Sequence, residues 1–178
     1  MGKPKEVKKI LISENKIKKK VKVLAGKIAR DYKKNIYCVS ILKGAVVFLS
    51  DLSRELSKKG ISTEFNFMKV SSYSGTKTTG KVKIELDVNN AKGKNVLIVE
   101  DIVDTGITLD YVKKHLLKKG AKSVKICALM DKPSRRIKKI KIDYLGFTIP
   151  NYFIVGYGTD YNEKYRNLPF VGILKEYR

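Results

Sequence analysis

The chain has few acidic residues for its length, and this scarcity makes their positions informative. Its 178 residues include 17 Asp and Glu against 39 Lys and Arg, which gives a formal net charge of +22. Such a charge attracts polyanions, from nucleic acids to phosphorylated metabolites, without choosing between them. A Lys-rich surface is also common as a plain solvated face. A cluster of acids on this background therefore indicates a specific role.

The chain also has few residues that bind zinc or form disulfides. Cys38 and Cys127 each lie in an apolar, strand-like run, so we expect two small buried side chains rather than a disulfide or a metal pair. The single histidine, His115, lies in a predicted helix, where we expect an ordinary helical residue. No cluster has zinc-ligand spacing, and zinc chemistry is not predicted.

Long apolar runs are missing as well. No stretch of about twenty apolar residues is present, so no membrane span is predicted. The basic N-terminus, MGKPKEVKKI, leads into no apolar signal core, so we expect a cytoplasmic protein. With 43% hydrophobic residues, the chain is long enough for one compact core and too short for two ordinary domains. We therefore expect a single domain over residues 1–178.

The apolar pattern alternates between two kinds of segment. Apolar runs at 36–42, 96–100 and 123–130 are typical of strands that are covered on both faces. Helical spacing of apolar residues predicts helices, and alternation or short apolar runs predict further strands. The predicted helices begin after Ser13 and cover 46–58 and 107–119. This order favours an α/β fold with a twisted, mainly parallel sheet and helices on both faces.

The stretch VLIVEDIVDTGITLDYV at residues 96–112 carries the strongest chemical signal. Its predicted strand is followed by DTGIT, in which Gly106 permits a tight turn into the next helix. The first turn of that helix offers unpaired N–H groups and the positive end of its dipole. Thr105 and Thr108 add hydroxyl donors, so the turn predicts a seat for one phosphate group. Neither the Walker pattern nor the Gly-x-Gly-x-x-Gly pattern is present.

Two adjacent carboxylates, Glu100 and Asp101, end the predicted strand just before this seat. Carboxylates accept hydrogen bonds from sugar hydroxyls and hold Mg²⁺ directly or through its waters. Ligands bind beyond the carboxyl ends of parallel strands in such folds. Residues suited to bind phosphate, ribose and Mg²⁺ therefore follow one another in the sequence. This order indicates a sugar phosphate as substrate. The alternative is an ordinary N-cap Asp104 with two solvent-facing acids.

The same stretch closely resembles the phosphoribosyl-pyrophosphate signature of type I phosphoribosyltransferases, and more narrowly that of hypoxanthine-guanine phosphoribosyltransferases. The likeness spans nearly the whole chain. LKGA resembles the pyrophosphate loop, VSSYSG the mobile lid, DKPSRR the purine-side segment, and FIVGYGTDYNEKYRNLPFVG the C-terminal purine- and metal-binding run. The resemblance implies the type I phosphoribosyltransferase fold, with a small purine-side hood formed by the N-terminal segment and roughly residues 131–178.

The resemblance further implies a Mg²⁺-dependent reaction in which a purine base and phosphoribosyl pyrophosphate give a nucleoside monophosphate and pyrophosphate. Asp104 would accept a proton near the purine N7, and a non-proline cis peptide is expected near the pyrophosphate loop. The other implied roles are ribose binding and secondary metal contact by Glu100 and Asp101; 5′-phosphate binding by Thr105, Gly106, Ile107 and Thr108; pyrophosphate binding by Lys43, Gly44 and Arg166; metal ligation by Asp160; purine binding by Lys132, Phe153 and the backbone of Ile154; and a lid from Ser72 and Tyr73.

Read singly, several of these residues have plainer interpretations. Phe153 could be a core residue, Asp160 a turn residue, Arg166 an ion-pair partner and Lys132 part of a solvated basic face. The main rival function is an RNA-binding transcription attenuator on the same fold, which the net charge keeps open. Such regulators resemble a Tyr-containing version of the DTG site, so Asp104 argues against nucleic acid as the main partner.

Further alternatives concern the substrate and the assembly. A paralogous enzyme could prefer xanthine, adenine or orotate, and the late FIVGYGTDYNEKYR run favours 6-oxopurines over the last two. An assembly protein with a vestigial site is disfavoured, because every expected chemical group is present. The resemblance implies a homodimer or homotetramer, without indicating its interface.

Overall fold

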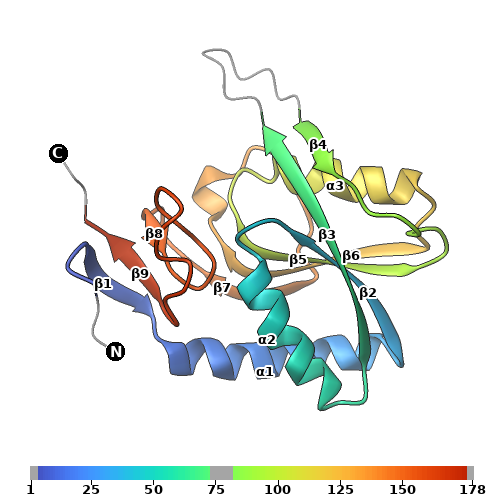
Figure 1. The fold of residues 1–178 in the computed structure, drawn as a ribbon, viewed down its shortest axis with the longest axis horizontal. Helices are drawn as coiled ribbons and strands as arrows, with labels where there is room; N and C mark the ends of the chain where they lie inside the picture. The colour runs from blue at the N-terminus through green and yellow to red at the C-terminus, as the bar shows by residue number, and fades with distance from the viewer. Residues whose placement is uncertain (1–3, 73–81, 176–178) are drawn as a thin grey trace.

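The computed structural model describes residues 4–72 and 82–175. These residues form one six-stranded sheet, one three-stranded sheet and helices packed against the larger sheet (Figure 1). In chain order the elements are β1 (Val7–Ile12), α1 (Glu14–Asp31), β2 (Asn35–Ile41), α2 (Val46–Ser57), β3 (Ser62–Ser72), β4 (Val82–Leu86), β5 (Asn95–Val103), α3 (Ile107–Lys118), β6 (Ser123–Asp131), η1 (Pro133–Arg135), β7 (Tyr144–Thr148), β8 (Ile154–Val155) and β9 (Val171–Leu174).

The larger sheet has the strand order β4-β3-β2-β5-β6-β7. Its strands pair in parallel except at one edge, where β4 runs antiparallel to β3. Helices α1 and α2 share one buried apolar cluster with this sheet, and α3 contributes to a second cluster. The predicted mainly parallel sheet with helices on both faces is confirmed.

The buried positions of β5 show why residues 96–99 of this strand are all apolar. Leu97 and Val99 belong to the cluster of α1 and α2, whereas Val96 and Ile98 belong to the cluster of α3. All four are fully buried, because side chains alternate between the two covered faces. Burial of each contributes about 1.5–3 kcal/mol of transfer free energy. The strand is therefore anchored in the middle of the domain, and its carboxyl end is held rigidly.

Parallel pairing brings three strand ends to one edge of the sheet. Strand β5 pairs with β2 on one side and with β6 on the other. The loops that follow these three strands contain LKGA, DTGIT and DKPSRR. Segments about sixty and thirty residues apart in sequence thus meet at the edge where α/β folds bind ligands.

The smaller sheet joins the two ends of the described chain. Its order is β1-β9-β8, with antiparallel pairs throughout. Val7, Val155 and Phe170 pack with Leu168 and Leu174 in a small buried cluster. Figure 1 shows this sheet beside the N-terminal end of α1, on the side of the molecule away from α3. It is built from the segments that were expected to form the hood.

Local details differ from the prediction in three places. Strand β5 continues to Val103, so Glu100 and Asp101 lie within it and not at its end. Ser13 precedes α1 as expected, but its side chain makes no capping hydrogen bond. The predicted loop after β6 contains the short 3₁₀ helix η1, which Pro133 begins. Cys38 and Cys127 are both buried and unlinked, as predicted. None of the helices in the described ranges is long and apolar enough to cross a membrane.

Candidate active site

Two hollows open at the edge where β2, β5 and β6 end. One has a volume of about 260 Å³ and is lined by the DTGIT turn together with Glu100. The other, of about 210 Å³, is lined by Asp101, Lys132, Phe153 and residues near them. Ile102 and Asp104 line both. A larger hollow of about 430 Å³ lies between α1 and α2 and contains none of the predicted site residues.

The DTGIT turn has the geometry of an anion seat. Gly106 has φ 80° and immediately precedes α3, and a Cβ there would lie 2.5 Å from the backbone oxygen of Lys138. Thr105 Oγ1 accepts a long 3.4 Å hydrogen bond from the N–H of Ile107. Thr105, Gly106 and Thr108 all line the first hollow. The N-terminus of α3 therefore faces a cavity that can take a phosphate group.

Glu100 and Asp101 form no direct ion pair in the described part of the chain, although the charge of Arg166 acts to lower the pKa of Asp101. Asp101 is only 8% exposed, and burial raises its pKa to about 6, although the backbone N–H of Ile102 donates to its Oδ1 at 2.7 Å. Burial and the neighbouring Asp101 raise the pKa of Glu100 well above its usual value. Glu100 Oε2 is buried with no hydrogen-bond partner. Such groups fit ligand hydroxyl donors or a cation.

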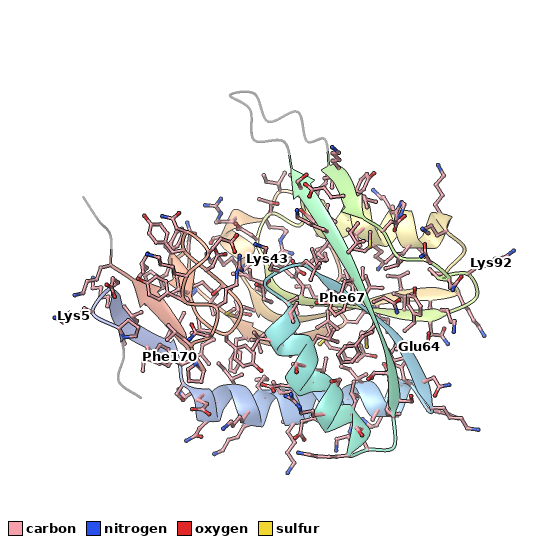
Figure 2. The ribbon with its side chains drawn as sticks, viewed as in Figure 1. Lys5, Lys43, Glu64, Phe67, Lys92 and Phe170 are labelled. Atoms are coloured by element: carbon pink, nitrogen blue, oxygen red, sulfur yellow. The ribbon has the colours of Figure 1, made fainter. Side chains whose placement is uncertain are left out.

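The LKGA loop contacts Asp101 through the backbone of Gly44. A Cβ at Gly44 would overlap Asp101 Oδ2, and a Cβ at Gly158 would overlap the carbonyl oxygen of Gly44. The expected cis peptide is present, between Leu42 and Lys43. Figure 2 shows Lys43 between the smaller sheet and the larger one. Glycine at both positions is what allows the three segments to meet.

Charged groups of the 158–166 segment converge with Lys43. Arg166 Nη1 donates to the carbonyl of Gly158 at 2.8 Å, and its Nη2 lies 2.8 Å from Asp160 Oδ1. Glu163 Oε2 lies 3.0 Å from Lys43 Nζ and 3.2 Å from Arg166 Nη2. The structure thus brings together the cations predicted to bind pyrophosphate and the predicted metal ligand. Glu163 was not predicted, because nothing in its sequence neighbourhood points to Lys43.

The second hollow has an aromatic wall and a basic end. Phe153 is 56% exposed, which excludes the interpretation of this ring as a core residue. It meets Tyr161 edge-on, with ring centroids 5.6 Å apart. Burial lowers the pKa of Lys132, while Asp104 acts in the opposite direction. An exposed ring beside a partly desolvated ammonium suits a flat, polar heterocycle.

Asp104 has an arginine neighbour that the sequence did not reveal. Arg135 Nε lies 2.8 Å from Asp104 Oδ1, although the geometry is not that of a hydrogen bond. Arg136 donates from Nε to the carbonyl of Asp104 at 3.0 Å and also contacts the carboxylate of Asp131. The two arginines of DKPSRR therefore differ in role: Arg136 fixes backbone, whereas Arg135 faces the carboxylate.

The predicted lid lies at the edge of the described residues. Ser72 is the last residue of β3, and Tyr73 lies outside the described residues. The role of both residues as a lid remains a prediction.

Comparison with known proteins assigns this arrangement to a family. A model of the phosphoribosyl transferase domain matches residues 8–162, and the chain belongs to the phosphoribosyltransferase family. A hypoxanthine-guanine phosphoribosyltransferase of Lactococcus lactis subsp. lactis is 51% identical over 174 residues, which is 96% of this chain and 93% of that protein. The resemblance to this branch of the family is thereby confirmed.

Comparison with solved structures supports the same family assignment. A hypoxanthine-guanine phosphoribosyltransferase of Bacillus anthracis is 44% identical, with a TM-score of 0.88 over 96% of this chain and 99% of that one. The hypoxanthine phosphoribosyltransferase of Trypanosoma cruzi, in complex with the product IMP, is 35% identical, with a TM-score of 0.91 over 98% of each chain. The type I fold expected from the sequence is confirmed.

The contact between Gly44 and Asp101 generates a first prediction. Gly44→Ala should lower kcat/KM by about 100-fold, because the added Cβ displaces the Asp101 carboxylate or the loop, and misplacement by about 1 Å has costs of this size. Steady-state assays measure the loss, and thermal unfolding checks that the variant is folded. Gly26→Ala in α1, whose Cβ would lie 3.8 Å from Lys59 Cε, is the control. Full activity of Gly44→Ala would contradict the described contact.

The burial of Asp101 generates a second prediction. Its pKa rises from 3.8 to about 6 on folding, so the folded state binds more protons between these values and loses stability as the pH rises through them. The loss amounts to about 3 kcal/mol. Without metal or substrate, Asp101→Asn should therefore gain stability relative to the natural protein between pH 4 and pH 7.5. Urea unfolding at both pH values measures this, with Asp110→Asn as control. A difference independent of pH would contradict it.

Proposed function

We propose that the chain transfers the 5-phosphoribosyl group from phosphoribosyl pyrophosphate to N9 of hypoxanthine or guanine, which gives IMP or GMP and pyrophosphate. One observation supports this most strongly: a phosphate seat at the start of α3 and an aromatic-walled hollow share Asp104 in their linings. A nucleoside monophosphate has its phosphate and its base at opposite ends, with the ribose between them. The IMP complex of the Trypanosoma cruzi enzyme is the matching product.

The 5′-phosphate binds at Thr105, Gly106, Ile107 and Thr108, where the N–H groups at the start of α3 and the Thr hydroxyls donate to its oxygens. Glu100 and Asp101 accept hydrogen bonds from the ribose hydroxyls. The buried, unpartnered Oε2 of Glu100 supports this assignment, since a buried acceptor without a donor is costly until a ligand supplies one.

The purine stacks on Phe153, and the backbone of Ile154 contacts the edge of the base. Lys132 donates a hydrogen bond to the 6-oxo oxygen. An ammonium group has donors and no acceptor, so the exocyclic amine of adenine would leave it unpaired. This pairing accounts for a preference for 6-oxopurines.

The reaction breaks the bond between C1′ and the pyrophosphate oxygen and forms a bond between N9 and C1′. Asp104 accepts the proton that the base loses from N7. The ribosyl group carries positive charge in the transition state, which the carboxylates of Glu100 and Asp101 stabilise. Lys43 and Arg166 neutralise the departing pyrophosphate, and Gly44 binds the same group.

Among the described residues no three acids are arranged as a ready-made metal site, so Mg²⁺ would be held by a protein carboxylate together with pyrophosphate oxygens. Asp160 would ligate the ion, with Glu100 and Asp101 as secondary oxygen donors, and hard oxygen ligands are those that Mg²⁺ prefers. When bound, the ion lowers the negative charge that builds up on the pyrophosphate oxygens. A lid from Ser72 and Tyr73, of which Tyr73 lies outside the described residues, would keep water from the activated sugar. The enzyme acts as a single-domain protomer of a homodimer or homotetramer in the cytoplasm, with the smaller sheet as its purine-side hood.

The assignment of the proton acceptor can be tested directly. Asp104→Asn should lower kcat by about 10²–10⁴-fold, because an amide cannot accept the N7 proton. An absorbance assay with hypoxanthine, phosphoribosyl pyrophosphate and Mg²⁺ measures the change. The control is Asp110→Asn, which removes an exposed α3 carboxylate paired with Lys114 at 2.8 Å. Normal turnover by Asp104→Asn would show that another group takes the proton.

The assignment of the base can be tested with four purines. We expect turnover of hypoxanthine and guanine and little turnover of adenine, because Lys132 offers only donors to the 6-position. Xanthine shares the 6-oxo group, so its rate decides whether the enzyme is a xanthine-preferring paralogue. Separate assays with each base and the same phosphoribosyl pyrophosphate give the ranking. If adenine is the best substrate, the assignment of Lys132 is wrong.

A further inference from the structure

The turn from Tyr161 to Lys164 has an unusual residue at its tip. Tyr161 and Lys164 exchange backbone hydrogen bonds of 3.2 and 3.0 Å and pair as an antiparallel bridge. The two residues between them, Asn162 and Glu163, have φ values of 50° and 61°. Positive φ at both central positions defines a type I′ turn. Asn is common at the first of these positions and Gly at the second.

Glu163 therefore occupies a turn position whose backbone conformation favours glycine. A β carbon makes the left-handed conformation unfavourable for most residues, and Glu lacks the short polar side chain that lets Asn and Asp adopt it more readily. Backbone strain of this kind is found where the side chain has a function. The contacts of the Glu163 carboxylate indicate what that function is.

The Glu163 carboxylate bridges the two cations assigned to pyrophosphate. Its Oε2 lies 3.0 Å from Lys43 Nζ and 3.2 Å from Arg166 Nη2, and Lys43 is 120 positions away in sequence. Its backbone N–H donates to Asp160 Oδ2 at 2.9 Å. One anionic oxygen between two cations is also the arrangement that a pyrophosphate oxygen would adopt between them.

We propose that Glu163 is a displaceable counter-ion for Lys43 and Arg166, which it holds together in the free enzyme and releases when pyrophosphate or phosphoribosyl pyrophosphate binds. This inference rests on the proposed function, through the assignment of those two cations. The Glu163 side chain is 64% exposed, so it can turn outward into water when it is displaced. Arg166 keeps its contacts with Gly158 and Asp160, so its guanidinium stays in position.

The consequence is a lower affinity of the enzyme for pyrophosphate, the leaving group. Each pyrophosphate must compete with a carboxylate that is attached to the protein and always present. The competition lowers the affinity of the free enzyme for pyrophosphate and favours release of this product. The same carboxylate keeps two cations from repelling each other while the site is empty.

The test compares pyrophosphate binding in the whole protein and in matched variants. Glu163→Gln removes the charge and retains the size and the backbone conformation. Glu64→Gln is the control, because Glu64 is 50% exposed and lies 3.1 Å from Lys94, far from the site in sequence. Isothermal titration with inorganic pyrophosphate and Mg²⁺ gives Kd, and steady-state assays give kcat and the KM for phosphoribosyl pyrophosphate.

We expect pyrophosphate to bind Glu163→Gln about 3- to 10-fold more tightly than the natural protein, as the loss of two exposed ion pairs predicts. KM for phosphoribosyl pyrophosphate should fall by a similar factor while kcat falls or is unchanged, and Glu64→Gln should change neither. Unchanged or weaker binding by Glu163→Gln would overturn the proposal. If the natural protein itself fails to bind pyrophosphate, the assignment of Lys43 and Arg166 is wrong, and the inference falls with it.

A second variant separates charge from backbone strain. Glu163→Gly removes the carboxylate and also relieves the positive φ, so it should bind pyrophosphate as tightly as Glu163→Gln and in addition raise Tm by about 1–3 °C. This variant also replaces Glu163→Gln if the latter does not fold. Tighter binding with either variant supports the proposal, and unaltered binding with the folded variant contradicts it.

Discussion

The parallel pairing of β5 between β2 and β6 is the constraint on which the site depends. Because both faces of β5 are buried, its register is fixed by apolar side chains such as Leu97 and Ile98, which a shift of one residue would exchange between faces. The polar loops that follow the three strands have no such support of their own. These loops are positioned because the strands before them cannot slide. The same constraint fixes the positions of the proposed substrate-binding groups.

The charged groups of the site are balanced against one another in the described structure. Asp104 faces Arg135, while Lys43 and Arg166 face Glu163. Asp101 and Glu100 form no such pair, and burial raises the pKa of both, although the charge of Arg166 acts in the opposite direction on Asp101. Under the proposed function, substrate binding exchanges an internal partner for an external one at the pyrophosphate end, whereas at the ribose it supplies hydrogen-bond partners to the two acids.

The sequence predicted the local parts of this site and missed the parts made by tertiary contact. The acids and the DTGIT turn were readable because strand, turn and helix follow one another in one short stretch. The contact of Lys43 with Glu163 was not readable, because a β2 loop and a distant turn meet only after folding. The roles of Arg135 and Arg136 were hidden in a basic run of similar side chains, which only their orientation distinguishes. The larger sheet was predictable from hydrophobic runs. The absence of a capping hydrogen bond from the Ser13 side chain at the start of α1 was not predictable from the sequence.

The backbone contact of Gly44 with Gly158 joins the two sheets without an intervening side chain. Gly158 belongs to the segment between β8 and β9, and Gly44 follows β2, so the smaller sheet rests on the larger one at the pyrophosphate loop. No flexible side chain is interposed to absorb a displacement. A displacement of the smaller sheet at this contact would therefore be transmitted directly to the loop that is proposed to bind pyrophosphate.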